Sequence, residues 1–206
     1  MYNRRRSNTD PISTIIALVI VAIISIIGCS TAGSAPTEGV VSTYDCNYRV
    51  LSLDTQIETV DKNGNAVTIK GDIFRLFEDP LSMVDASGNV LVYAGDAYNF
   101  ITQNDHGIYV GGEHVYDVVG EFKWLADSYT VRDAEGTEVA YVDFNMWDTV
   151  GKMYTADGTL IAQYNSGYFN HDYTVSIFEA NEFDEDVVQM IFASYVSDKE
   201  ADNSSN

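Results

Sequence analysis

Few residues of this chain have the types and spacing that catalysis needs. The three histidines, His106, His114 and His171, lie in separate expected hairpins, with no i, i+4 pair and no HExxH motif. His106 falls in an expected turn, where its ring would be solvated. His171 beside Asp172 is better interpreted as a surface pair at a strand end than as a catalytic base. With no G-x-S-x-G elbow and no phosphate-binding glycine loop, we expect a protein that is not an enzyme and holds no cofactor.

Two other residue types leave alternatives open. The chain after residue 28 holds thirty carboxylates, so some of them must lie close together, and a hydrolase with an unrecognised carboxylate site is one alternative. Trp124 and Trp147 could stack against a sugar or a lipid, although packing in the core or at the barrel rim is the favoured interpretation.

Cys29 has the setting of a lipid-modified cysteine. Arg4, Arg5 and Arg6 precede an apolar run over 15–27, which ends at Gly28-Cys29. A basic end, an apolar stretch and a small residue before cysteine are typical of an export signal, and the ending looks like a bacterial lipobox. That resemblance implies cleavage before Cys29 and a lipid on its thiol. An uncleaved membrane helix of about 17 residues is the alternative, at the short limit for spanning.

The elements that would carry any site are mostly strands joined by tight turns. Period-two alternation of apolar and polar residues recurs along the chain, and prolines occur only at positions 11, 36 and 80. Between these stretches a turn pattern of Asp, one or two polar residues and Gly recurs, because Gly supplies the positive φ that a tight hairpin demands. Its copies place glycine at positions 64, 88, 136 and 158, with a looser fifth at Gly107. About twelve strands are expected, enough to close a barrel.

One predicted helix, over 185–197, stands apart from the strands. Its core, Val187 to Val196, is apolar on every side of a 3.6-residue period, so it must be buried in protein or in lipid. Thirteen residues cannot span a hydrocarbon core of about 30 Å. We therefore expect a helix enclosed by the sheet.

This arrangement resembles the LURP-one-related family, which shares its fold with the tubby C-terminal domain and the phospholipid scramblases. The residues that carry the resemblance are Asp61 and Gly64, Asp85 and Gly88, Gly120-Glu121-Phe122, Asp133 and Gly136, the segment 168–175, and Asp184-Glu185-Asp186 before the helix. The resemblance implies a mainly β fold: a closed antiparallel barrel of about twelve strands around one buried C-terminal helix.

The resemblance also implies functions that the residues support poorly. Tubby-type members bind phosphoinositides through a basic patch, whereas the basic residues here are scattered. Scramblase-like members have an acidic stretch before the last helix that is proposed to hold calcium, and Asn181, Asp184 and Asp186 are its weak counterparts here. Helix capping by Asp184 and dipole compensation by Asp186 are the favoured interpretation, so we expect no metal site. A scramblase-like, lipid-handling or calcium-responsive protein remains an alternative.

Charge and cysteine content restrict the partners. The net charge is −20, and since 1–28 carries three arginines against one aspartate, the remainder carries −22. Such a surface repels nucleic acid. If Cys29 is lipidated, Cys46 is single and there is no disulfide framework.

The chain therefore divides into a signal or anchor (1–28), a flexible tether (29–43), a barrel domain (44–197) and a disordered tail (198–206). We expect a membrane-tethered, monomeric, extracytoplasmic barrel at the cell membrane that binds an unidentified ligand or partner without catalysis.

Overall fold

The computed structural model describes residues 38–49, 55–71, 80–96, 105–121, 127–167 and 172–204. The predicted signal segment 1–28 and Cys29 lie outside these residues. None of the helices among the described residues has the length and apolar character needed to cross a bilayer.

Twelve antiparallel strands close into one barrel in which each strand pairs with its neighbours in sequence, and β1 pairs with β12 to close the cylinder. This confirms the predicted fold. In chain order the elements are β1 Val40–Tyr48, β2 Gln56–Val60, β3 Ala66–Gly71, β4 Leu81–Asp85, β5 Val90–Asp96, β6 His106–Val110, β7 Glu113–Glu121, β8 Ser128–Asp133, β9 Glu138–Phe144, β10 Val150–Thr155, β11 Leu160–Ser166, β12 Tyr173–Phe178 and α2 Glu185–Ser204.

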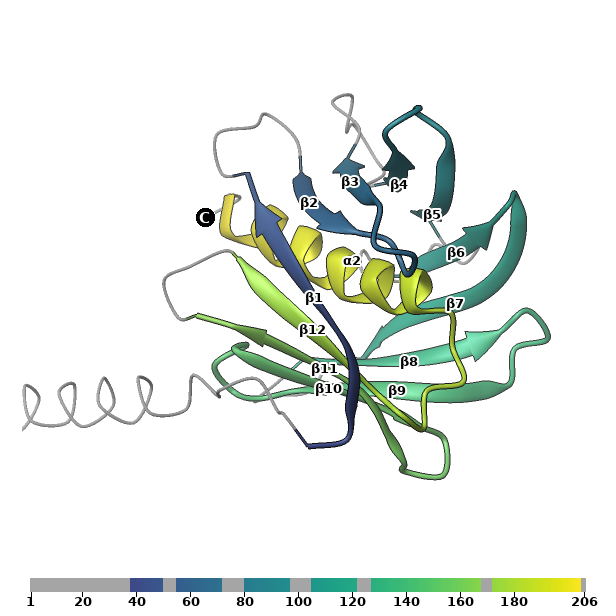
Figure 1. The fold of residues 1–206 in the computed structure, drawn as a ribbon. Coiled ribbons are helices and arrows are strands. Elements are labelled where there is room, and N and C mark those ends of the chain that lie inside the picture. The colour runs from purple at the N-terminus through teal and green to yellow at the C-terminus, as the bar shows by residue number, and fades with distance from the viewer. Residues whose placement is uncertain are drawn as a thin grey trace, which may run out of the picture.

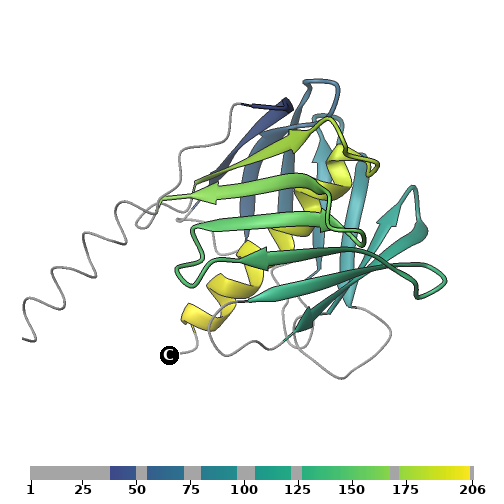
Figure 2. The same cartoon turned by 90° about the horizontal axis from the view of Figure 1, so that it is seen from below.

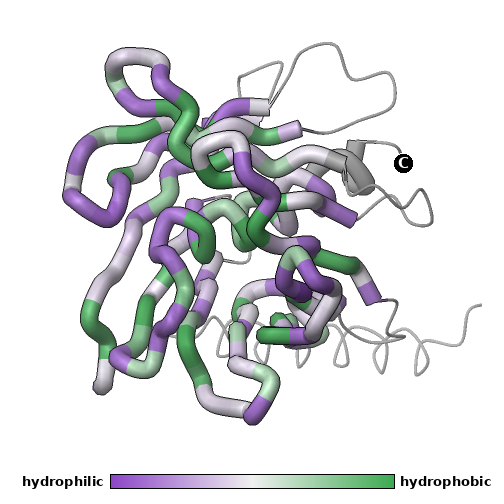
Figure 3. Tube along the Cα trace, turned by 90° about the vertical axis from the view of Figure 1, so that its right-hand side faces the viewer, coloured by the Kyte–Doolittle hydropathy of each residue, from purple (hydrophilic) through white to green (hydrophobic). Residues whose placement is uncertain are grey.

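The strands alternate as a barrel wall requires. On β2 the burial pattern has Ile57 fully buried between half-exposed neighbours, and β3 buries Val67 and Ile69 in the same way. Figure 3 shows this alternation of hydrophobic and hydrophilic residues along the chain. Side chains of period two point to opposite faces of a sheet, so one set faces the interior of the cylinder and the other faces water.

Helix α2 runs inside the barrel. Figures 1 and 2 show it between β1 and β8–β12 on one side and β2–β6 on the other. All residues from Val187 to Ser197 are buried, and Phe192 and Ala193 have no exposed surface. Aromatic rings join the helix to the wall, for example Phe192 stacked on Tyr164 with centroids 5.7 Å apart. Since fully burying a side chain such as Phe or Ile contributes about 1.5–3 kcal/mol, the helix is the core of the barrel.

Four predicted turns have the expected structure. Their glycines, Gly64, Gly88, Gly136 and Gly158, all adopt a φ between 81° and 88°, where a side chain would be strained. In the first, an oxygen of the Asp61 carboxylate accepts hydrogen bonds from the backbone N–H groups of Asn63 and Asn65, at 2.9 and 2.8 Å.

The looser fifth turn was placed wrongly. Gly107 lies within β6, paired with Gly95 of β5, so His106 belongs to a strand. The hairpin that follows β6 turns instead at Gly111-Gly112, which adopt φ of 60° and 85°. A Gly-Gly pair between two strands is itself a strong turn signal that the expectation missed.

Both ends of the barrel domain also extend beyond the expected bounds. The expected tether 29–43 overlaps β1, which begins at Val40 and pairs with β12 from Val40 to Cys46. The expected tail 198–206 overlaps α2, which continues to Ser204. Asp198 is only 7% exposed, because it faces a buried histidine. Polar residues in these segments led us to expect a tether and a tail, where the structure has a paired strand and a helix with a buried aspartate.

Candidate functional site

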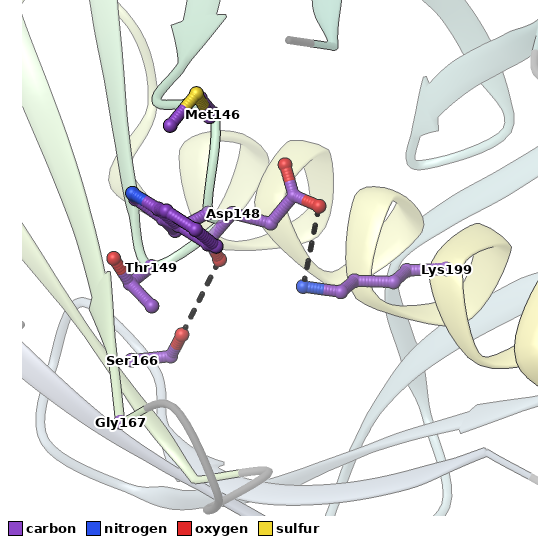
Figure 4. A pocket seen from close by; sticks show the side chains of 7 residues that line it. Met146, Asp148, Thr149, Ser166, Gly167 and Lys199 are labelled. Carbon is purple, nitrogen blue, oxygen red and sulfur yellow. Dashed lines mark hydrogen bonds and ion pairs between the residues drawn. The ribbon is translucent and has the colours of Figure 1, made fainter. Parts of the chain in front are cut away.

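A pocket of about 380 Å³ lies where the β9–β10 turn meets the end of β11 and the late part of α2. The turn contributes Met146, Trp147, Asp148 and Thr149, β11 and the residue after it contribute Ser166 and Gly167, and the helix contributes Lys199. Figure 4 shows the Asp148 and Lys199 side chains reaching toward each other across this space.

The turn that carries four of these residues is held rigidly by Asn145. The side-chain oxygen of Asn145 accepts the N–H groups of Thr149 and Val150 at 2.9 and 3.2 Å, and its amide donates to the Thr149 hydroxyl at 3.0 Å. The N–H of Asp148 donates to the Asn145 carbonyl at 2.9 Å. These bonds fix Asp148 at a φ of 53°, the left-handed region that non-glycine residues rarely adopt.

Opposite charges face each other across the pocket. Lys199 Nζ lies 3.6 Å from Asp148 Oδ2, and the two side chains are 36% and 30% exposed. The Ser166 hydroxyl donates to the Asp148 carbonyl at 3.5 Å. Because both charged groups are partly solvated, the ion pair itself contributes little stability and leaves hydrogen-bonding capacity on each side.

Behind the pocket, Tyr195 of α2 borders the same end of the core. Lys199 Nζ lies 5.9 Å from the centroid of its ring, which is close enough for a cation–π contact. Burial raises the pKa of Tyr195 well above its ordinary value, and the charge of Asp148 adds to this effect. The phenol is therefore neutral at physiological pH.

His106 is buried, not solvated. It is 2% exposed, and its Nε2 lies 3.0 and 3.1 Å from the two carboxylate oxygens of Asp198 on α2. The Tyr129 hydroxyl donates to the same carboxylate at 3.5 Å. The His106–Asp198 pair joins β6 to the helix inside the barrel, so a substrate could reach it only if the barrel opened.

His114, the other histidine that the structure describes, has a different carboxylate partner. His114 on β7 contacts Asp117 at 2.9 Å, on a half-buried part of the surface. His171 and Trp124 lie outside the described residues, whereas Trp147 lines the pocket.

The weak calcium candidates are used to begin the helix. Asp184 accepts the N–H of Asp186 at 3.0 Å as a helix cap, and its carboxylate also pairs with Lys62. Asn181 accepts the N–H of Phe183 and donates to its carbonyl, both at 3.0 Å. Asp186 accepts the N–H of Lys62 at 2.8 Å. Within the residues described, no group of three or more His, Cys, Asp or Glu could hold a metal ion.

Cys46 is a buried, free thiol. It is 1% exposed and contacts the Thr59 hydroxyl at 3.6 Å. Burial raises the pKa of its thiol to about 11. Since the thiolate is the reactive form, this cysteine is protected from reagents in the folded protein.

Comparison with known proteins bears on the fold. No family model and no curated protein matches the sequence. One solved structure is similar: the X-ray structure of the Arabidopsis thaliana protein AT5G01750, with a TM-score of 0.54 and 15% identity. The match covers 78% of this chain and 93% of the plant protein. At this identity the similarity shows a shared barrel fold and nothing about activity.

The pocket could not be found by motif. Asp148 and Lys199 are 51 positions apart and belong to no known pattern, and Lys199 lies in the segment expected to be a tail. A signal was nevertheless present: Asn145 to Thr149 separates two strands without a glycine and contains Met146 and Trp147, which a simple hairpin turn does not need.

Proposed function

We propose that this chain is a lipid-anchored, extracytoplasmic, non-catalytic member of the LURP-one-related family that binds a ligand at the end of its barrel. The observation that carries the proposal is the filled interior. Because α2 occupies the space inside the strands, with Phe192 and Ala193 fully buried, the barrel has no room for a ligand along its axis. Binding then belongs to the outer surface or to an end, where the pocket at Asp148 and Lys199 lies.

The anchor part of the proposal is supported by the sequence. The arginines at 4–6, the apolar run 15–27 and Gly28-Cys29 have the order of a lipoprotein signal. Such a signal would place the barrel outside the cytoplasmic membrane, with β1 beginning eleven residues after Cys29. An acidic domain suits this place, since its net charge keeps it soluble.

Metabolic labelling with a palmitate analogue tests the anchor. The wild type and Cys46→Ser should incorporate the label, and Cys29→Ser should not. Cys46→Ser is the matched control, because it removes the other cysteine of the chain. Equal labelling of Cys29→Ser, or no labelling of any variant, would overturn lipid attachment at Cys29. Retention of unlabelled protein in the membrane fraction would identify the uncleaved helix instead.

A further inference from the structure

The β9–β10 turn shares two hydrogen bonds with four other turns of the barrel but has different side chains and closes one residue later, because the N–H of Asn145 donates to Val150 and not to the fifth residue. In all five turns the carbonyl of the first residue accepts the N–H of the fourth residue, and its side-chain oxygen accepts the N–H of the fifth. The five turns begin at Asp61, Asp85, Asp133, Asn145 and Thr155. Four turns therefore form these two hydrogen bonds without the side chains that line the pocket.

The residues inside these turns differ in a consistent way. The second and third positions are small or polar in four turns: Lys62-Asn63, Ala86-Ser87, Ala134-Glu135 and Ala156-Asp157. In the β9–β10 turn these two residues are Met146 and Trp147, and Met146 is 58% exposed. The fourth residue is glycine in the other four turns. In the β9–β10 turn it is Asp148, although this residue also has a positive φ. An exposed methionine and a non-glycine residue at positive φ therefore distinguish this turn from the other four.

We propose that this turn, with Lys199 and Ser166, binds a neutral sugar unit. The proposal rests on the proposed function and names the ligand class of that site. The pocket volume, about 380 Å³, is within the range of small-molecule sites. Its lining combines an indole, a carboxylate, an ammonium and a hydroxyl, and sugar hydroxyls both donate and accept hydrogen bonds.

The charges of the pocket select a neutral ligand. Because Asp148 and Lys199 lie 3.6 Å apart, a singly charged group that approaches its counter-charge on one residue is repelled by the like charge of the other at nearly the same distance. A pair of hydroxyls satisfies both residues without this repulsion. The net charge of −20 further disfavours acidic sugars at longer range. Trp147 lines the same space, and an aromatic residue in a pocket lining suits packing against the C–H groups of a sugar ring.

Titration of the full-length protein with sugars tests the proposal. The protein is held in a detergent without a sugar head group, and binding is followed by calorimetry and by tryptophan fluorescence. The probes are cellobiose, maltose and N,N′-diacetylchitobiose as neutral sugars, glucuronate as an acidic sugar and glycylglycine as a zwitterion. At least one neutral sugar should bind about tenfold more tightly than glucuronate and glycylglycine.

Three variants connect binding to the turn. Asp148→Gly restores the residue that the four other turns have and removes the strain of a non-glycine residue at positive φ. It should therefore fold with equal or higher thermal stability but lose about tenfold or more in sugar affinity. Trp147→Ala should lose affinity as well. Gly136→Asp is the matched control, because it places a carboxylate at the same position of the β8–β9 turn, where the φ is 84° and no atom lies within 4 Å. It should lower thermal stability through backbone strain but leave sugar affinity unchanged.

The outcomes decide between distinct conclusions. Binding of no neutral sugar, preference for glucuronate or glycylglycine, or unchanged affinity in folded Asp148→Gly and Trp147→Ala would each overturn the proposal. Tighter binding of a soluble polymer than of its disaccharide identifies a glycan chain as the ligand, and equal binding identifies the free sugar. Cys29→Ser should bind sugar normally, so failure of the anchor and failure of the pocket are distinguishable.

Discussion

At the scale of residues, the His106–Asp198 pair is a polar contact buried inside the barrel. A buried carboxylate is costly unless it is paired, and here Asp198 faces both His106 and Tyr129. The histidine therefore allows α2 to continue inside the barrel beyond its apolar segment.

Removal of one partner should show this dependence. We expect His106→Phe to lower the free energy of unfolding by about 3–5 kcal/mol, because it leaves the Asp198 carboxylate buried without its imidazole partner. The double variant His106→Phe, Asp198→Leu should recover most of this loss, since it removes both polar groups. Urea denaturation of the single and double variants measures the effect. A His106→Phe protein as stable as the wild type would show that the pair contributes nothing.

At the scale of elements, the turns set the response to acid. The Asn65 side-chain amide, aided by the backbone N–H groups of Asn65 and Asn63, holds the pKa of Asp61 below its ordinary 3.8. The Asn89 amide lowers the pKa of Asp85 in the same way. A lowered pKa in the folded state stabilises the protein above the unfolded pKa, and this contribution is lost as the pH falls through the folded value.

Substitution of Asp61 separates charge from hydrogen bonding. Asp61→Ala should cost about 1–2 kcal/mol near pH 7, where the carboxylate accepts its hydrogen bonds, and clearly less near pH 3. Asp61→Asn keeps an acceptor oxygen and should cost less, with little change between the two pH values. Urea denaturation at both pH values checks this. An equal cost of Asp61→Ala at both would contradict a lowered pKa.

The same elements show how far the sequence predicts the structure. Glycine at a positive φ and apolar residues with period two are local requirements, so the turns at Gly64, Gly88, Gly136 and Gly158 and the class of fold could be predicted. The end of α2 could not, because Asp198 is buried against partners far away in the sequence, among them His106, 92 positions away. The pocket could not be predicted for the same reason, because Asp148 and Lys199 come together only when the barrel closes around the helix.

At the scale of the whole molecule, the strands close into a barrel around α2, and α2 fills the interior of that barrel. Each of the twelve described strands has a hydrogen-bonded neighbour on both sides, with the shortest pairing, of two residue pairs, between β1 and β2. Inside the barrel, the helix supplies the apolar contacts that the inner faces of the strands need, from Val187 to Val196. Any ligand must then bind at a surface that the filled barrel presents.

Thiol labelling of the helix tests this central claim most directly. Ser194→Cys places a thiol at a position 1% exposed on α2, and Met146→Cys places one at a position 58% exposed on the β9–β10 turn. Both are made with Cys29→Ser, and the buried Cys46 gives a slow background. An enclosed helix predicts that a maleimide modifies Met146→Cys at once but Ser194→Cys only as fast as the protein unfolds. Equally rapid modification of both cysteines in a folded protein would contradict an enclosed α2.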